Sequence, residues 1–65
     1  MKTANPKWPT WIVTGELNWD ASRHGTVRVK ANTERKARIY GEKRLKAEYK
    51  TNLVKIEKVV REEQL

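Results

Sequence analysis

The basic residues in the middle of the chain have the types and spacing that suggest chemistry. Between positions 23 and 50, ten Lys or Arg residues are opposed by three Glu, and this stretch accounts for the whole net charge of +7. Guanidinium and ammonium groups bind phosphate oxygens and displace the counterions of a nucleic acid. A positive field localised in this way favours an anionic partner. We predict that the contacts are made by Arg28, Lys30, Arg35, Lys36, Lys43, Lys46 and Lys50.

Aromatic rings offer a second kind of contact, and the candidates are Trp8, Trp11, Trp19, Tyr40 and Tyr49. Trp8 lies between Pro6 and Pro9, outside any strand pattern, and it either contacts a partner or covers an open sheet edge. An indole ring in contact with a nucleic acid can stack on an unpaired base. Trp11 and Trp19 are assigned to the core instead, because a chain without Phe needs both rings to supply its buried area.

The segment with Asp20, Ser22 and His24 contains the residue types of a nucleophilic triad. It lies in a predicted hairpin loop, and a 65-residue chain offers little space from which water is excluded. The absence of Cys removes thiolate zinc sites, His24 by itself makes no metal site, and Glu16 with Asp20 is a loose carboxylate pair. We therefore predict a protein that is not an enzyme, with no catalytic residue, metal site or cofactor.

Alternation of apolar and polar residues predicts the first two strands. In residues 11–19 the odd positions are expected to face the core, up to and including Trp19. The turn formers of residues 20–25 predict a hairpin loop longer than the tightest type. In residues 26–31 the valines and Ala31 are expected to face inward while the basic residues face water.

A helix is predicted over residues 33–49, with Asn32 or Thr33 as its cap. At 100° per residue, Ala37, Gly41 and Leu45 form one stripe, which should lie on the sheet. Gly costs about 1 kcal/mol in mid-helix relative to Ala, so Gly41 indicates close approach of the helix to the sheet.

The opposite side of the helix is cationic. Glu48 falls near the middle of the apolar stripe, so either the helix ends before it or its carboxylate pairs with Arg44 one turn earlier.

The alternation of residues 53–60 predicts a third strand, with Val54 and Ile56 facing inward. The fold class is thus α+β, a single ββαβ domain whose three-stranded mixed sheet has the order 2-1-3 and carries one helix on one face. Strands two and three should run parallel to each other. We divide the chain into a flexible arm (1–10), the ββαβ domain (11–61) and a frayed tail (62–65).

The longest apolar run is three residues, Trp11 to Val13, far below the roughly 20 that a membrane helix needs. The first six residues have no apolar stretch of a signal peptide. We therefore expect a cytoplasmic protein with no membrane contact. A monomer is the expected state, and a homodimer through a sheet edge is the alternative.

Three segments, Thr14–Leu17, Val29–Glu34 and Val54–Val59, follow a recognisable order of strand, strand-to-helix junction and closing strand. In this the chain resembles the archaeal large-subunit ribosomal protein LX and its eukaryotic relatives, small basic ββαβ domains. The resemblance implies binding to ribosomal RNA. The chain also looks like small phage-encoded proteins that bind and modulate host machinery.

The sequence therefore predicts a small basic binding module that contacts RNA or DNA backbone through a cationic helix face, with little sequence discrimination. The alternative is a phage-type protein–protein interaction module. It would dock on an acidic host protein surface, or add a strand to its partner through the edge of strand two or three.

Overall fold

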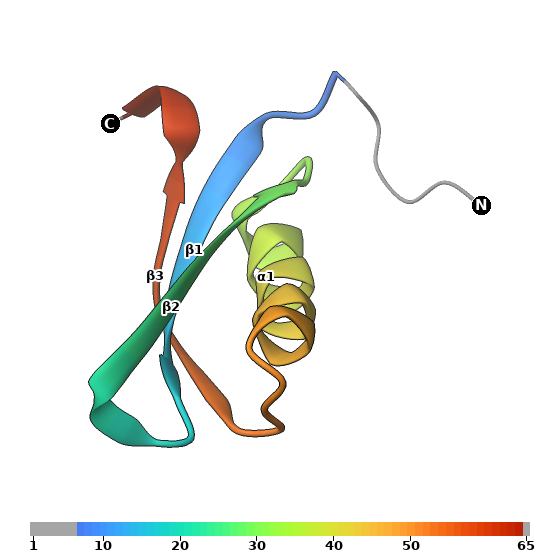
Figure 1. The fold of residues 1–65 in the computed structure, drawn as a ribbon. Helices are drawn as coiled ribbons and strands as arrows, with labels where there is room; N and C mark the ends of the chain where they lie inside the picture. The colour runs from blue at the N-terminus through green and yellow to red at the C-terminus, as the bar shows by residue number, and fades with distance from the viewer. Residues whose placement is uncertain (1–6, 65) are drawn as a thin grey trace.

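The computed structural model describes residues 7–64, and Figure 1 shows the helix lying against one face of the sheet. The elements are β1 (Thr10–Leu17), β2 (Asp20–Lys30), α1 (Glu34–Glu48), β3 (Val54–Arg61) and a 3-10 turn, η1 (Glu62–Gln64). The chain is thus a small α+β domain with the order ββαβ, as predicted.

Strand β1 is the centre of the sheet, with the order β2-β1-β3. It pairs antiparallel with both neighbours. Strands β2 and β3 run parallel to each other with β1 between them, both as expected. Every hydrogen-bonded pair is therefore antiparallel, where the sequence predicted a mixed sheet.

The hairpin between β1 and β2 turns earlier than predicted. Leu17 pairs with Asp20, and the two residues between them have positive φ angles, 53° at Asn18 and 55° at Trp19. Left-handed conformation at both central positions is that of the tight type I′ turn, whose twist matches the strands. The predicted loop over 20–25 was wrong, because this segment belongs to β2.

The early turn also removes Trp19 from the core. The inward alternation of β1 ends at Leu17, which is buried, whereas Trp19 is 71% exposed. The assignment of Trp19 to the core was therefore wrong.

Asp20, the first residue of the long strand β2, makes local hydrogen bonds of the kind found in turns. Its Oδ1 accepts hydrogen bonds from the Ser22 hydroxyl at 2.7 Å and the Ser22 backbone N–H at 2.9 Å. Because these bonds stabilise the ionised form, the pKa of Asp20 is lower than its usual value. Residues 21–23 have no partner on β1, since Glu16 next pairs with His24.

Strand β3 contains one extra residue. Gly15 pairs with Ile56 and Thr14 with Lys58, which leaves Glu57 without a partner in a bulge. Because of the extra residue, the next inward-facing side chain after Ile56 is Val59 rather than Lys58. The side chains of Ile56 and Val59 both pack against the core. The prediction that Val54 and Ile56 face inward is confirmed.

The helix matches its prediction within one residue at each end, and Thr33 is its N-cap, accepting from the Lys36 N–H at 3.2 Å. Its buried residues are Ala37, Gly41 and Leu45. A Cβ atom placed on Gly41 would lie 2.6 Å from both methyl groups of Val13. The helix therefore rests directly on the central strand, as the mid-helix glycine indicated.

Trp11 is a buried member of the core. It is 8% exposed, and its Nε1–H donates to the carbonyl oxygen of Ala31 at 2.9 Å. The guanidinium of Arg61 lies 5.8 Å from the Trp11 ring centroid, within cation–π range. The core assignment of Trp11 is thus confirmed.

Both predicted terminal segments differ in detail from the structure. Of the predicted arm, residues 1–6 lie outside the described residues, Trp8 is half-buried, and the carbonyl of Pro9 accepts from the N–H of Ala31 at 3.2 Å. Where a frayed tail was predicted, η1 places Glu62 in an ion pair with Arg28. No helix within residues 7–64 is long and apolar enough to cross a membrane.

Gly41→Ala tests how closely the helix packs on the central strand. Alanine raises helix propensity by about 1 kcal/mol, but its methyl group would force Val13 to move, at a cost of about 1–3 kcal/mol. We expect a net loss of unfolding free energy, measured by urea denaturation. Glu48→Ala, at an exposed position of α1, is the control and should change stability little. Stabilisation by Gly41→Ala would contradict the close contact.

Trp19→Gly tests the turn. Glycine adopts positive φ without the steric cost of about 1–2 kcal/mol that other residues carry, and Asn-Gly is a favoured type I′ pair. Because the Trp19 side chain is largely exposed, we expect a higher melting temperature in a calorimetric scan. A lower melting temperature would mean that contacts of the indole ring stabilise the fold by more than the positive φ of Trp19 destabilises it.

Candidate nucleic-acid interface

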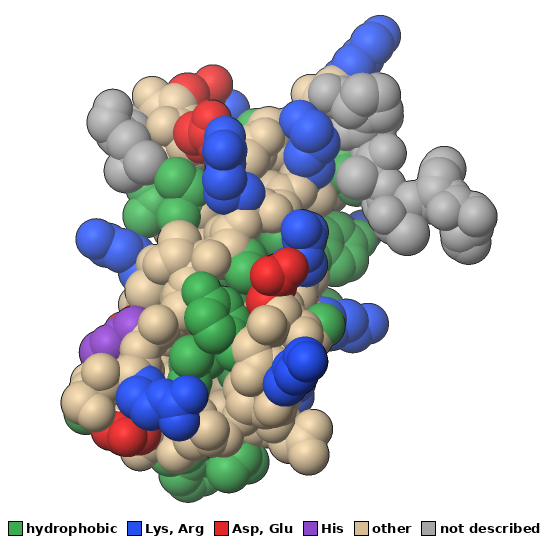
Figure 2. All heavy atoms as spheres, viewed as in Figure 1, with side chains coloured by type: hydrophobic (Ala, Val, Ile, Leu, Met, Phe, Trp, Pro, Cys, Tyr) green, Lys and Arg blue, Asp and Glu red, His purple; other side chains and the backbone are tan. Residues whose placement is uncertain are grey.

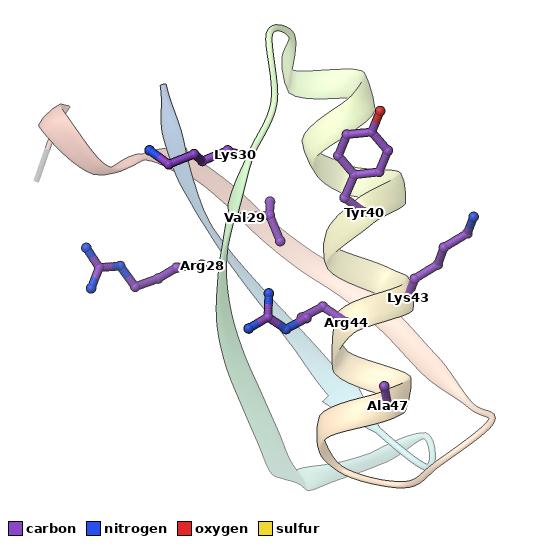
Figure 3. Close-up of a pocket in the computed structure, with 7 residues that line it drawn as sticks. All are labelled: Arg28, Val29, Lys30, Tyr40, Lys43, Arg44 and Ala47. Carbon is purple, nitrogen blue, oxygen red and sulfur yellow. The ribbon is translucent and has the colours of Figure 1, made fainter. Parts of the chain in front are cut away.

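A groove of about 470 Å³ lies between the edge strand β2 and the helix α1. We call it the basic groove. Four of its lining residues are cations and none is acidic, and the full set is Arg28, Val29, Lys30, Tyr40, Lys43, Arg44 and Ala47 (Figure 3). A concave surface lined by positive charges raises the local concentration of anions.

The floor of the basic groove is apolar because two periodicities meet there. The alternation of β2 turns Val29 toward the helix, while its two neighbours face the other way (Figure 3). On α1, Tyr40 and Ala47 are seven residues apart and therefore lie on the same flank. Together these three side chains form a surface against which the flat part of a ligand can rest.

The charged groups border the groove rather than converge in it. Figure 3 shows Arg44 pointing from α1 toward β2, whereas Lys43 points away from β2. Arg28 and Lys30 extend to the side of β2 opposite the helix. An arrangement with charges along both borders fits an elongated anion better than a single small one.

The cations of the basic groove differ in how far their charge is already compensated. Arg28 donates from Nε to Glu62 Oε1 at 2.9 Å, and Lys30 donates from Nζ to Oγ1 of Thr10, its partner on β1, at 3.3 Å. Arg44 and Lys43 form no ion pair with any residue in the range 7–64. The pair of Arg44 with Glu48 considered from the sequence is not formed; Glu48 is the exposed last residue of α1.

Of the residues predicted to contact a nucleic acid, three line the basic groove and five do not. Those in the groove are Arg28, Lys30 and Lys43, and those outside it are Arg35, Lys36, Lys46, Lys50 and Trp8. The ammonium of Lys46 lies 3.1 Å from Glu42 Oε2, so its charge is compensated. Figure 2 shows basic side chains spread over the visible face, with fewer acidic ones between them.

Sequence reasoning did not select Arg44, and it considered Tyr40 only as one of five aromatic rings that could stack on a base. Their spacing with Ala47 places them on one flank of the helix, and this was visible in the sequence. Which flank faces β2 depends on how the helix crosses the sheet, and that follows from its contacts with β1 and β2. The sequence alone offered no signal for that choice.

The polar residues of the predicted hairpin loop are not assembled as a triad. Asp20 accepts both its hydrogen bonds from Ser22. The imidazole of His24 instead faces β3, with Nε2 at 3.3 Å from Glu57 Oε1.

Comparisons with known proteins return no match, whether with family models, with curated proteins or with solved structures. The resemblances to the ribosomal LX family and to phage-encoded proteins stay predictions.

Proposed function

We propose that this protein binds the phosphate backbone of RNA or DNA through the basic groove. The observation that carries the proposal is the combination of four bordering cations with no acidic lining residue. Lys43 and Arg44 are available for phosphate, because no described residue pairs with them. Phosphate oxygens would take the place of water around these groups and release condensed counterions.

The lining also supports binding with little sequence discrimination. Lys and Arg on the borders reach phosphates, which are the same for every base. Tyr40, half-buried in the floor, offers an aromatic surface for a sugar or a base, and stacking tolerates all four bases. The geometry therefore suits a module that follows a backbone rather than one that reads base edges.

Charge reversal on the two flanks of the helix tests the proposal. Lys43→Glu with Arg44→Glu reverses two groove cations, and Arg35→Glu with Arg38→Glu makes the same change in net charge on the other flank. All four residues are exposed, so both variants should fold. Fluorescence anisotropy would measure binding to labelled single- and double-stranded RNA and DNA, at salt concentrations from about 20 to 150 mM.

For the unchanged protein, in which Arg28 is paired with Glu62, three phosphate contacts predict a slope of log K against log salt of about −2.7 on duplex DNA and about −2.1 on single strands. The groove variant should lose about tenfold or more in affinity relative to the flank variant. Equal losses would show that the overall charge, not the groove, binds the nucleic acid. Absence of binding at low salt would overturn the proposal and favour an acidic protein surface as partner. The four probes distinguish RNA from DNA.

Removing Glu62 should strengthen binding. Glu62→Gln releases Arg28 from its ion pair and adds one cation to the basic groove. We expect tighter binding at low salt and a salt dependence steeper by about one unit. Glu63→Gln removes the same charge but releases Arg61, which lies outside the groove. If both variants bind equally, Arg28 takes no part.

A further inference from the structure

We propose that Glu16, His24 and Glu57 form a binding site for Zn²⁺ on the face of the sheet opposite the helix. One residue comes from each strand: Glu16 from β1, His24 from β2 and Glu57 from β3. One ligand atom of each residue lies within 4.8 Å of the other two. An imidazole nitrogen with two carboxylates is a donor set that Zn²⁺ accepts.

The spacing suits a small tetrahedral ion. Zinc–nitrogen and zinc–oxygen bonds of about 2.0–2.1 Å put the ligand atoms of a tetrahedral site about 3.3 Å apart. The Nε2 of His24 and Oε1 of Glu57 are already 3.3 Å apart. The ligand atom of Glu16 lies within 4.8 Å of both, so its carboxylate would move toward them to complete the triangle, and a water molecule can take the fourth position.

Two irregularities of the sheet bring these residues together. On one side of β1, three extra residues in β2 let His24 pair with Glu16. On the other side, the bulge in β3 inserts Glu57 beside Gly15, the neighbour of Glu16. Bulges occur next to functional sites because they change the direction of a side chain. Here both flanking strands depart from regular pairing at the same end of β1.

The carboxylate of Glu16 is the ligand with no other role. It is half-buried and makes no hydrogen bond or ion pair with any of the described residues. On β3, Glu16 pairs with Lys55, and the two side chains form no ion pair. An ion pair of His24 with Glu57 alone would leave Glu16 unused, whereas a zinc ion would use all three.

A bound zinc ion would connect the two outer strands to the central one. Since an ion that binds the folded state better than the unfolded state shifts the folding equilibrium, zinc would stabilise the sheet. The site lies on the face opposite the helix, toward which Arg28 and Lys30 also extend, but it shares no residue with the basic groove.

Calorimetric titration of the tag-free full chain with zinc chloride tests the site. The chain has one His and no Cys, so a shift of the imidazole nitrogen resonances on binding reports His24 unambiguously. The variants are His24→Gln, Glu16→Gln and Glu57→Gln, each with its fold checked by circular dichroism. Glu48→Gln, at the exposed end of α1, is the charge-matched control for the two Glu variants.

We expect one zinc ion per chain, a shift of the His24 Nε2 resonance and a rise in melting temperature. Each ligand variant should weaken binding about tenfold or more, while the control stays within about twofold. Absence of heat and of an imidazole shift at about 1 mM zinc would overturn the proposal. So would equal affinity of His24→Gln and the unchanged protein, because zinc would then be bound elsewhere. If His24→Gln fails to fold, Glu57→Gln decides the same question.

Discussion

The contact between Gly41 and Val13 is the constraint on which the rest of the molecule depends. One helix covers one face of a three-stranded sheet, and the core is small because the second face has no covering layer. With only a hydrogen atom at position 41, the helix approaches β1 closely enough to bury the valine completely. The same helix forms one border of the basic groove, and β2 forms the other.

Both neighbours of the central strand depart from regular pairing. β1 pairs on both sides, and both neighbours contain extra residues at its carboxyl end. Extra residues in a strand strengthen its twist and disrupt the regular row of hydrogen bonds. At this end of the sheet Gly25 packs so closely under Tyr49 that a Cβ atom there would lie 2.6 Å from the ring. The distortion is thus tied to the packing of the helix end and is a structural feature of the fold.

The two faces of the sheet have different chemistry. The helix side borders a groove whose lining is basic and apolar, suited to a polyanion. The opposite side gathers two carboxylates and one imidazole, suited to a cation. Arg28 belongs to both sides, because it lines the groove while its guanidinium pairs with Glu62. On β2, Val29 faces the groove, whereas Arg28 and Lys30 extend from the border of the groove toward the opposite face.

Most of the fold could be predicted from the sequence, because local patterns carry it. The alternation around Val13 and Val29, the apolar stripe through Gly41 and the cap at Thr33 each specify an element within a few residues. The turn at Trp19 was missed because a tryptophan with positive φ contradicts the usual preference of its residue type.

The candidate sites were decided largely by tertiary structure. The flank of α1 that faces β2, which brought in Arg44, depends on how the helix crosses the sheet. His24 and Glu57 are 33 positions apart in the chain, and the contact between their side chains depends on the register shifts in β2 and β3. Composition alone established that the middle of the chain is strongly basic, since charge adds along a sequence. Which charges lie together is a property of packing, because only folding brings distant residues within a few ångströms of each other.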